Sequence, residues 1–177
     1  MPSLMSRLVA PATLAMVSPA AAAEASSEDH RQIVGAVNEI ALAADLHEWD
    51  TVRRQFADIV IADSSSLTGV ASAEVRADEL VDGWKAFLPR FTSTQHLIGN
   101  HRVQIVSDRA RVTSSFIATH RLDGAPGGEL WTLGGRYTHT LQRTADGWKV
   151  TAMVMTWTWQ SGNTALPRLA AATAQTP

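Results

Sequence analysis

The strongest constraint on the fold is a change in the spacing of apolar residues near residue 92. Before this point apolar side chains recur every three or four residues, as on an amphipathic helix. After it they alternate with polar residues in four runs, at about 94–106, 110–122, 130–143 and 147–159, the pattern of β-strands. Short turn sequences separate the runs. Helices followed by an antiparallel meander predict an α+β domain, with the helices packed on one face of a curved sheet.

Three helical segments are expected before the meander. The first begins at Ser26 and ends near Asp45, and its early acidic residues complement the helix dipole. The second is the short "EWDTVRRQF", and the third is "SAEVRADELVDGWKAFLPRF", which Pro89 stops. Between them "ADIVIAD" predicts a short strand and "SSSLTGVAS" a loop.

Composition narrows the classes of function. A chain of 177 residues with 45% apolar content can bury one good core, so we expect one domain. A net charge of −2 with scattered Lys and Arg gives no basic surface for nucleic acid. Cysteine is absent, which excludes disulfides and thiolate chemistry. No metal-ligand motif, serine elbow or glycine-rich phosphate loop occurs, so we expect no metal and no cofactor.

The two ends of the chain carry separate expectations. Residues 1–23 combine Arg7, an apolar run and small residues before Glu24, which together predict a cleaved secretory signal. The run is too short and interrupted to span a membrane. The mature protein would then be periplasmic or secreted, and otherwise cytoplasmic. The folded domain is assigned to 24–162, and 163–177 is expected to be a flexible tail or to reach a partner.

Two histidines of the meander are candidate site residues. Alternation places His96 on one face of the first run, and places His120 on one face of the second, together with Phe116. Both could line one interior, although alternation alone does not prove it. Aromatic and apolar residues of the later runs would form its walls, a lining suited to a flat apolar ligand: Trp131, Leu133, Tyr137, Met155 and Trp157.

Asp45 is the candidate acidic partner. It follows the apolar face of the first helix directly and should point inward at the helix end. A carboxylate there could hold an imidazole in one tautomer and stabilise its charged form. A buried core histidine and a hydrogen-bonding helix end are the structural alternatives. His47, His101 and His139 are expected to face away from the cavity or to lie on a helix surface, without a role.

On these residues the chain resembles the SnoaL-like proteins of the nuclear transport factor 2-like superfamily, a cone-shaped α+β fold. The segments "ADLHEWDTV", "IADSSSL" and "TQHLIG" are similar to those of scytalone dehydratase that carry its catalytic Asp and His, and the hairpin from Gly134 to Lys149 is similar to that of hexachlorocyclohexane dehydrochlorinase. The resemblance implies three N-terminal helices on the concave face of a curved mixed or antiparallel sheet. It also implies an Asp45–His96 dyad, with His120 in the pocket if one hairpin is a residue shorter. Its implied pocket lining is Phe87, Phe91, Phe116, Leu133, Met155 and Trp157.

The sequence departs from the dehydratase pattern at two positions. Tyrosines of that enzyme, which hold a water near the substrate carbonyl, are replaced here by Ala44 and Ser64. Scytalone itself is therefore not the expected substrate. Another donor would have to polarise a carbonyl, and His120, Asn100 and Tyr137 are the candidates.

The leading hypothesis is a cofactor-independent lyase of the dehydratase or elimination type. His96, oriented by Asp45, would remove a proton from a small apolar ring compound, and His120 would protonate the leaving group or oxyanion. An isomerase or cyclase could use the same dyad, and a non-catalytic ligand-binding module is the alternative from another class. A sheet with apolar residues on both faces also predicts a homo-oligomer, a dimer or a trimer.

Overall fold

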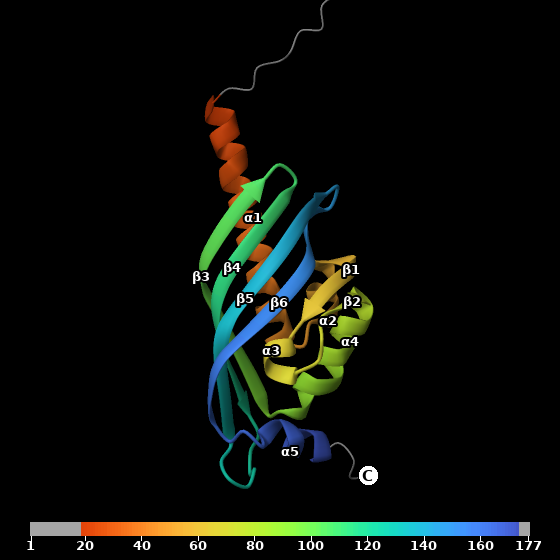
Figure 1. Ribbon diagram of the computed structural model, residues 1–177, viewed down its shortest axis with the longest axis vertical. Coiled ribbons are helices and arrows are strands. Elements are labelled where there is room, and N and C mark those ends of the chain that lie inside the picture. The colour runs from red at the N-terminus through yellow and green to blue at the C-terminus, as the bar shows by residue number, and fades with distance from the viewer. Residues whose placement is uncertain (1–18, 174–177) are drawn as a thin grey trace, which may run out of the picture.

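The computed structural model describes residues 19–173, which form one long sheet, five α-helices and a short 3-10 turn (Figure 1). Most of the expected secretory signal lies outside these residues, so export stays a prediction. The elements in chain order are α1 (Pro19–Asp45), α2 (Trp49–Arg54), β1 (Phe56–Asp63), α3 (Ser65–Thr68), β2 (Ala73–Arg76), α4 (Ala77–Phe87), a 3-10 turn (Leu88–Arg90), β3 (Ser93–Val106), β4 (Arg109–Arg121), β5 (Leu130–Thr144), β6 (Gly147–Gly162) and α5 (Leu166–Thr173).

The sheet has six strands in the order β2-β1-β6-β5-β4-β3. The four long strands β3 to β6 form the predicted antiparallel meander, and each boundary falls within a few residues of the expected one. Strand β1 runs parallel to β6, which makes the sheet mixed, and β2 pairs with the other edge of β1. The expected α+β fold with a curved mixed sheet and helices packed against it is therefore confirmed.

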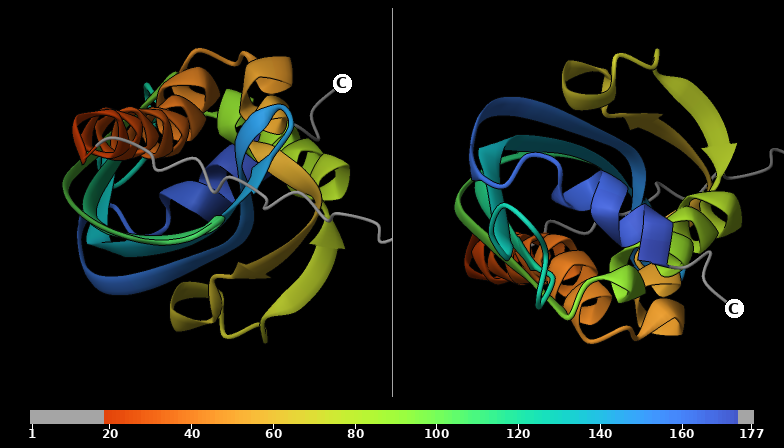
Figure 2. Two further views of the ribbon diagram at one scale, coloured as in Figure 1. Left: turned by 90° about the horizontal axis from the view of Figure 1, so that it is seen from above. Right: turned by 90° about the horizontal axis from the view of Figure 1, so that it is seen from below.

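Helix α1 lies in the hollow of the curved sheet, and the strands wrap partly around it when seen along the long axis (Figure 2). Its apolar positions recur at helical spacing and are almost fully buried, as for Ile33, Val37 and Ile40. They pack against buried residues of the sheet such as Val112 and Leu141. The main core therefore lies between α1 and the sheet.

An ion pair between Asp29 of α1 and Arg143 of β5 fixes the helix against the sheet. The carboxylate of Asp29 accepts two hydrogen bonds from the guanidinium of Arg143, at 2.5 and 2.6 Å, and a third from the indole of Trp148 at 3.1 Å. Arg143 also lies 4.4 Å above the Trp148 ring. A bidentate pair of this kind fixes orientation as well as distance, so α1 has a defined position on β5 and β6.

Three sequence expectations are corrected here. Helix α1 begins at Pro19 rather than Ser26, because the alanine-rich stretch before Ser26 has high helix propensity. The expected loop after β1 contains the single-turn helix α3. The third helix begins at Ala77, since residues 73–76 instead pair with β1 as strand β2. Pairing with a neighbouring strand outweighed the helical spacing of this segment.

The C-terminal segment was expected to be loose, and this expectation is wrong for residues 166–173. They form α5, in which Leu166 and Ala170 are fully buried. These two side chains pack in a second apolar cluster with Phe91 and Trp131. Helix α5 therefore covers one end of the sheet (Figure 1).

The outer face of the sheet carries apolar side chains that remain exposed. Leu97 and Ile117 are opposite one another on β3 and β4, and Trp159 lies on the same row on β6. Their exposed fractions are 60%, 44% and 44%. The homo-oligomer expected from such residues stays a prediction. Within residues 19–173, no helix is both long and apolar enough to cross a membrane.

Candidate active site

The candidate site is built around Asp45 and His96. Asp45 is the last residue of α1, and His96 lies on β3, the strand that α1 packs against. The Asp45 Oδ1 atom is 2.7 Å from Nδ1 of His96, and the backbone N–H of His96 donates to Oδ2 at 2.6 Å. The hydroxyl of Thr94 donates to Oδ1 at 2.7 Å. These three contacts from β3 therefore fix the Asp45 carboxylate and the His96 imidazole ring relative to each other.

The electrostatics of Asp45 favour its charged form. Burial acts to raise the pKa of Asp45, but the hydrogen bonds and charge of His96, with the Thr94 hydroxyl, outweigh it and lower the pKa below its usual value. An ionised Asp45 selects the His96 tautomer with the proton on Nδ1. The second ring nitrogen, Nε2, is then the free base.

His120 joins this pair from strand β4, as the sequence predicted. Its ring centroid is 5.6 Å from that of His96, and it is 4.8 Å from that of Phe91 and 4.7 Å from that of Trp131. Burial, helped by the neighbouring charge of His96, lowers the pKa of His120 to about 4. The ring is therefore neutral at pH 7. It can donate a hydrogen bond but does not carry the charge that the expected acid role would use.

A cavity of about 230 Å³ opens beside these histidines. Its walls are mostly apolar and come from α1, α4 and the inner face of the sheet. Eight residues were expected to form its lining, and six of them do: Phe87, Phe116, Trp131, Leu133, Tyr137 and Met155.

The other two expected residues, Phe91 and Trp157, are not among those that line the cavity. Phe91 packs against the rings of His120 and Phe87. Trp157 packs against the same apolar cluster from outside the cavity, and its backbone N–H donates to Ser66 of α3. Both residues support the wall without contacting the space.

Ala44 and Ser64 both line the cavity. At these two positions the resemblance placed tyrosines in the dehydratase. Small side chains leave that part of the cavity open, so a bound molecule could extend toward β1. Asp63 also lines this part, and the hydrogen bonds that it accepts from Ser65 lower its pKa. An ionised carboxylate here disfavours an anionic ligand.

Sequence reasoning missed His139. It was expected to face away from the cavity, but it is only 1% exposed and lines the cavity wall. The signal was available, because His139 has the same parity on β5 as Trp131, Leu133 and Tyr137. Burial and the charge of His101 lower the pKa of His139 to about 4.

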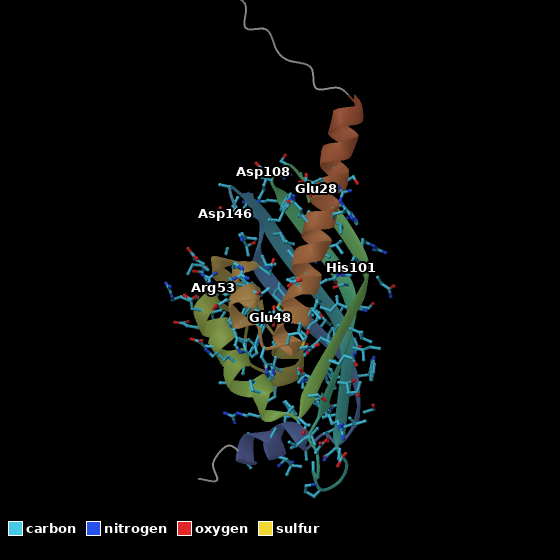
Figure 3. All side chains as sticks on the ribbon, turned by 180° about the vertical axis from the view of Figure 1, so that it is seen from behind. Glu28, Glu48, Arg53, His101, Asp108 and Asp146 are labelled. Atoms are coloured by element: carbon cyan, nitrogen blue, oxygen red, sulfur yellow. The ribbon has the colours of Figure 1, made fainter. Side chains whose placement is uncertain are left out.

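His101 was also expected to face outward, and this is wrong for a different reason. The pairing of β3 with β4 shifts between Gly99 and Arg102, and Asn100 has a φ of 56°. This β-bulge adds one residue, so the inward positions change from 94, 96 and 98 to 101, 103 and 105. His101 lies on β3 beside α1 (Figure 3), and its Nε2 atom is buried. His47 is exposed and stacks on Trp49, away from the cavity.

The donor set does not favour a metal. Among residues 19–173, no three His, Cys, Asp or Glu side chains converge as a metal ion would require. The groups at the site can instead hold and move a proton, because one imidazole has a charged partner and a second is neutral beside it. The chemistry that this arrangement supports is proton transfer in a largely apolar space.

The chain is thus an α+β protein with helices packed against a curved mixed sheet, in which the first helix presents a carboxylate to a histidine beside a mostly apolar cavity. The chain belongs to the SnoaL-like domain family, whose model matches residues 25–154. No curated protein sequence gives a significant match.

Solved structures agree with this assignment. The Kfla4162 protein from Kribbella flavida is 31% identical, with a TM-score of 0.77 over 81% of this chain and 99% of that one. A protein from Novosphingobium aromaticivorans provisionally named a scytalone dehydratase is 19% identical, with a TM-score of 0.67 over 80% and 91%. A type 2 hexachlorocyclohexane dehydrochlorinase is 15% identical, with a TM-score of 0.60 over 77% and 93%. The last two likenesses show the shared fold.

Proposed function

We propose that the protein is a cofactor-independent lyase that eliminates a small leaving group from an apolar ring compound. The observation that carries the proposal is the 2.7 Å contact between Asp45 Oδ1 and His96 Nδ1, on a ring that also lines the cavity. The two structures named for a dehydratase and a dehydrochlorinase support the same class of reaction.

The first step is proton removal by His96. Its Nε2 takes a proton from a carbon next to an activating group, while Nδ1–H remains hydrogen bonded to Asp45. The resulting imidazolium is stabilised by the ionised carboxylate, whose pKa is already lowered by this contact. A base of this kind contributes about 10²- to 10⁴-fold to the rate.

The electrons of the broken C–H bond form a carbon–carbon double bond, and the leaving group departs from the neighbouring carbon with the bonding pair. A ring N–H of neutral His120 donates a hydrogen bond to the oxygen or halogen on which negative charge develops. This role replaces the charged acid expected from the sequence, because the pKa of His120 is about 4. The proton on His96 then returns to the leaving group or to solvent.

The cavity supports an uncharged, mostly apolar substrate. Its lining contains the rings of Phe87, Phe116 and Trp131 but, among residues 19–173, no Lys or Arg. A volume of about 230 Å³ has room for a molecule of one or two rings. Aromatic walls that exclude water also strengthen the hydrogen bonds around the dyad.

The test is a substrate screen by mass spectrometry with cyclic hydroxy, halo and aryl-ether compounds. Wild type is compared with His96→Ala and Asp45→Asn, and His47→Asn is the control because His47 is exposed and has a φ of 59°, which Asn tolerates. We expect only wild type and His47→Asn to eliminate water or halide from a substrate, and we expect no elimination by His96→Ala or Asp45→Asn.

Other outcomes would move the assignment. A product of unchanged mass that requires His96 would make the protein an isomerase or cyclase. Equal turnover by wild type and His96→Ala would show that His96 is not the catalytic base. Compounds that bind without any conversion would favour a ligand-binding module.

A further inference from the structure

A group of buried polar atoms that have no hydrogen-bond partner among residues 19–173 lies at the end of the cavity wall away from His120. It comprises Nε2 of His101, Oγ of Ser114 and both ring nitrogens of His139. Ser114 and His139 are each 1% exposed. Buried polar atoms usually have a hydrogen-bond partner, so a cluster of four without one needs an explanation.

Strand register places the three side chains together. Gly99 pairs with Ser115 and Arg102 pairs with Thr113, so Ser114 is opposite the bulge that turns His101 inward. On the next strand Ser114 pairs with Tyr137, and His139 is two residues further along. Diagonal neighbours of this kind are within about 8 Å. The cluster therefore crosses three adjacent strands on the inner face of the sheet.

His139 connects this cluster to the cavity. It lines the same space as His96, and its ring centroid is 5.6 Å from that of Tyr137. Tyr137 in turn stacks on Phe116 at 4.3 Å, in the middle of the cavity wall. Along β5, His139 is six residues beyond Leu133, which is level with His96 across the strands. The cavity thus has polar groups at two places with an aromatic surface between them.

The charge of the cluster indicates what it can bind. The pKa of His139 is about 4 because of its burial, so its ring is neutral at pH 7 and offers one N–H donor and one nitrogen acceptor. Within the described part of the chain, no Lys or Arg lines the cavity to neutralise an anion. A hydroxyl or carbonyl oxygen can satisfy such a ring without introducing a buried charge.

We propose that His139, supported by His101 and Ser114, is a second polar subsite that binds an uncharged oxygen group at one end of an elongated substrate. This rests on the proposed function, since the reacting end of the same molecule lies at His96. The aromatic surface of Phe116 and Tyr137 contacts the apolar body between the two ends. The substrate class is therefore narrowed to flat molecules with oxygen groups at both ends.

The test compares two probes of equal body, biphenyl-4-ol and 4,4′-biphenyldiol, by isothermal titration calorimetry. Wild type should bind the diol about tenfold more tightly, which is the effect of one additional net hydrogen bond. His139→Phe keeps a ring of similar size but cannot hydrogen-bond the second hydroxyl, so it should abolish the preference for the diol over biphenyl-4-ol. His139→Gln retains a donor and an acceptor and should keep part of the preference.

A measurement on wild type avoids dependence on any variant. In ¹⁵N spectra of the histidine rings, the diol should shift the His139 resonances and biphenyl-4-ol should not. Equal affinity of wild type for both probes, no binding of either, or a preference that survives His139→Phe would overturn the subsite. A cluster filled by water alone predicts the first of these results.

The outcomes separate this proposal from the lyase reaction. The preference for the diol should persist in His96→Ala, since binding at His139 does not require the base. If the preference for the diol depends on His139 but the protein turns over no substrate, the lyase proposal is wrong and the subsite proposal stands. If turnover depends on His96 but the protein shows no preference for the diol, the lyase proposal stands and the subsite proposal is wrong.

Discussion

The carboxylate of Asp45 contacts His96 twice, once through the ring and once through the backbone amide. The second contact fixes the strand as well as the side chain. A helix C-terminus disfavours negative charge, yet Asp45 is the last residue of α1 and its pKa is lowered. The contacts from β3 therefore compensate an unfavourable position, and α1 and β3 are held together at the point where proton transfer is proposed.

Loss of these contacts should affect rate more than binding. We expect Asp45→Asn to lower kcat by about 10²-fold or more, because an amide stabilises the imidazolium less than a carboxylate does. Thr94→Val removes one hydrogen bond to Asp45 and should lower kcat only a few-fold. Steady-state kinetics on the first substrate found will check this order. A larger loss from Thr94→Val than from Asp45→Asn would contradict the dyad.

Stability should depend on pH through His120 and His139. The pKa of each is about 4 in the folded protein and about 6.5 when unfolded, so the unfolded state binds more protons between these values. The free energy of unfolding should be highest above pH 6.5. It should fall as the pH drops toward 4, by up to about 3 kcal/mol per histidine. Urea unfolding from pH 7.5 to 4 measures this slope. His139→Phe should reduce this slope by about half, because His120 still titrates, whereas His47→Asn should leave the slope unchanged.

Two adjacent glycines of β5 should differ sharply in their tolerance of a methyl group. A Cβ at Gly135 would lie 2.1 Å from the backbone oxygen of Thr156, and one at Gly134 would lie 2.4 Å from the Trp159 ring. Backbone cannot yield, whereas Trp159 is 44% exposed and can move. Gly135→Ala should lower the free energy of unfolding by about 3 kcal/mol or more, and Gly134→Ala by about 1 kcal/mol. Similar losses for the two variants in chemical denaturation would contradict the argument that Trp159 moves aside more easily than the backbone of Thr156.

Helix α5 should contribute to stability in spite of its place at the chain end. Leu166 is fully buried against the cluster that contains Phe91 and Trp131. We expect Leu166→Ala to lower the free energy of unfolding by about 2 to 4 kcal/mol. The exposed neighbour Thr164→Ala is the control and should change it by less than about 0.5 kcal/mol. An unchanged thermal midpoint for Leu166→Ala would mean that α5 does not pack as described.

The meander could be predicted because its alternation is long and regular, and each strand pairs with its sequence neighbour. Strand β2 could not, since its four residues continue the spacing of the helix that follows and pair as a strand only because β1 is adjacent. The acidic partner of His96 was found because Asp45 ends an apolar helical face. The inward direction of His101 depended on a one-residue bulge that alternation cannot detect. The fold could thus be predicted where the sequence patterns are local. The arrangement of side chains at the end of the cavity away from His120 could not.

The bulge at Asn100 has a consequence for protein engineering. Deleting the extra residue would restore a regular ladder while Ile98 and His101 kept their inward directions, since one residue would again separate each pair of inner positions. Because a bulge bends its strand, deleting this residue would change the bend of β3 while the same side chains still faced inward. Curvature and wall chemistry are separate design variables in this strand, so the cavity could be reshaped without exchanging the residues that line it.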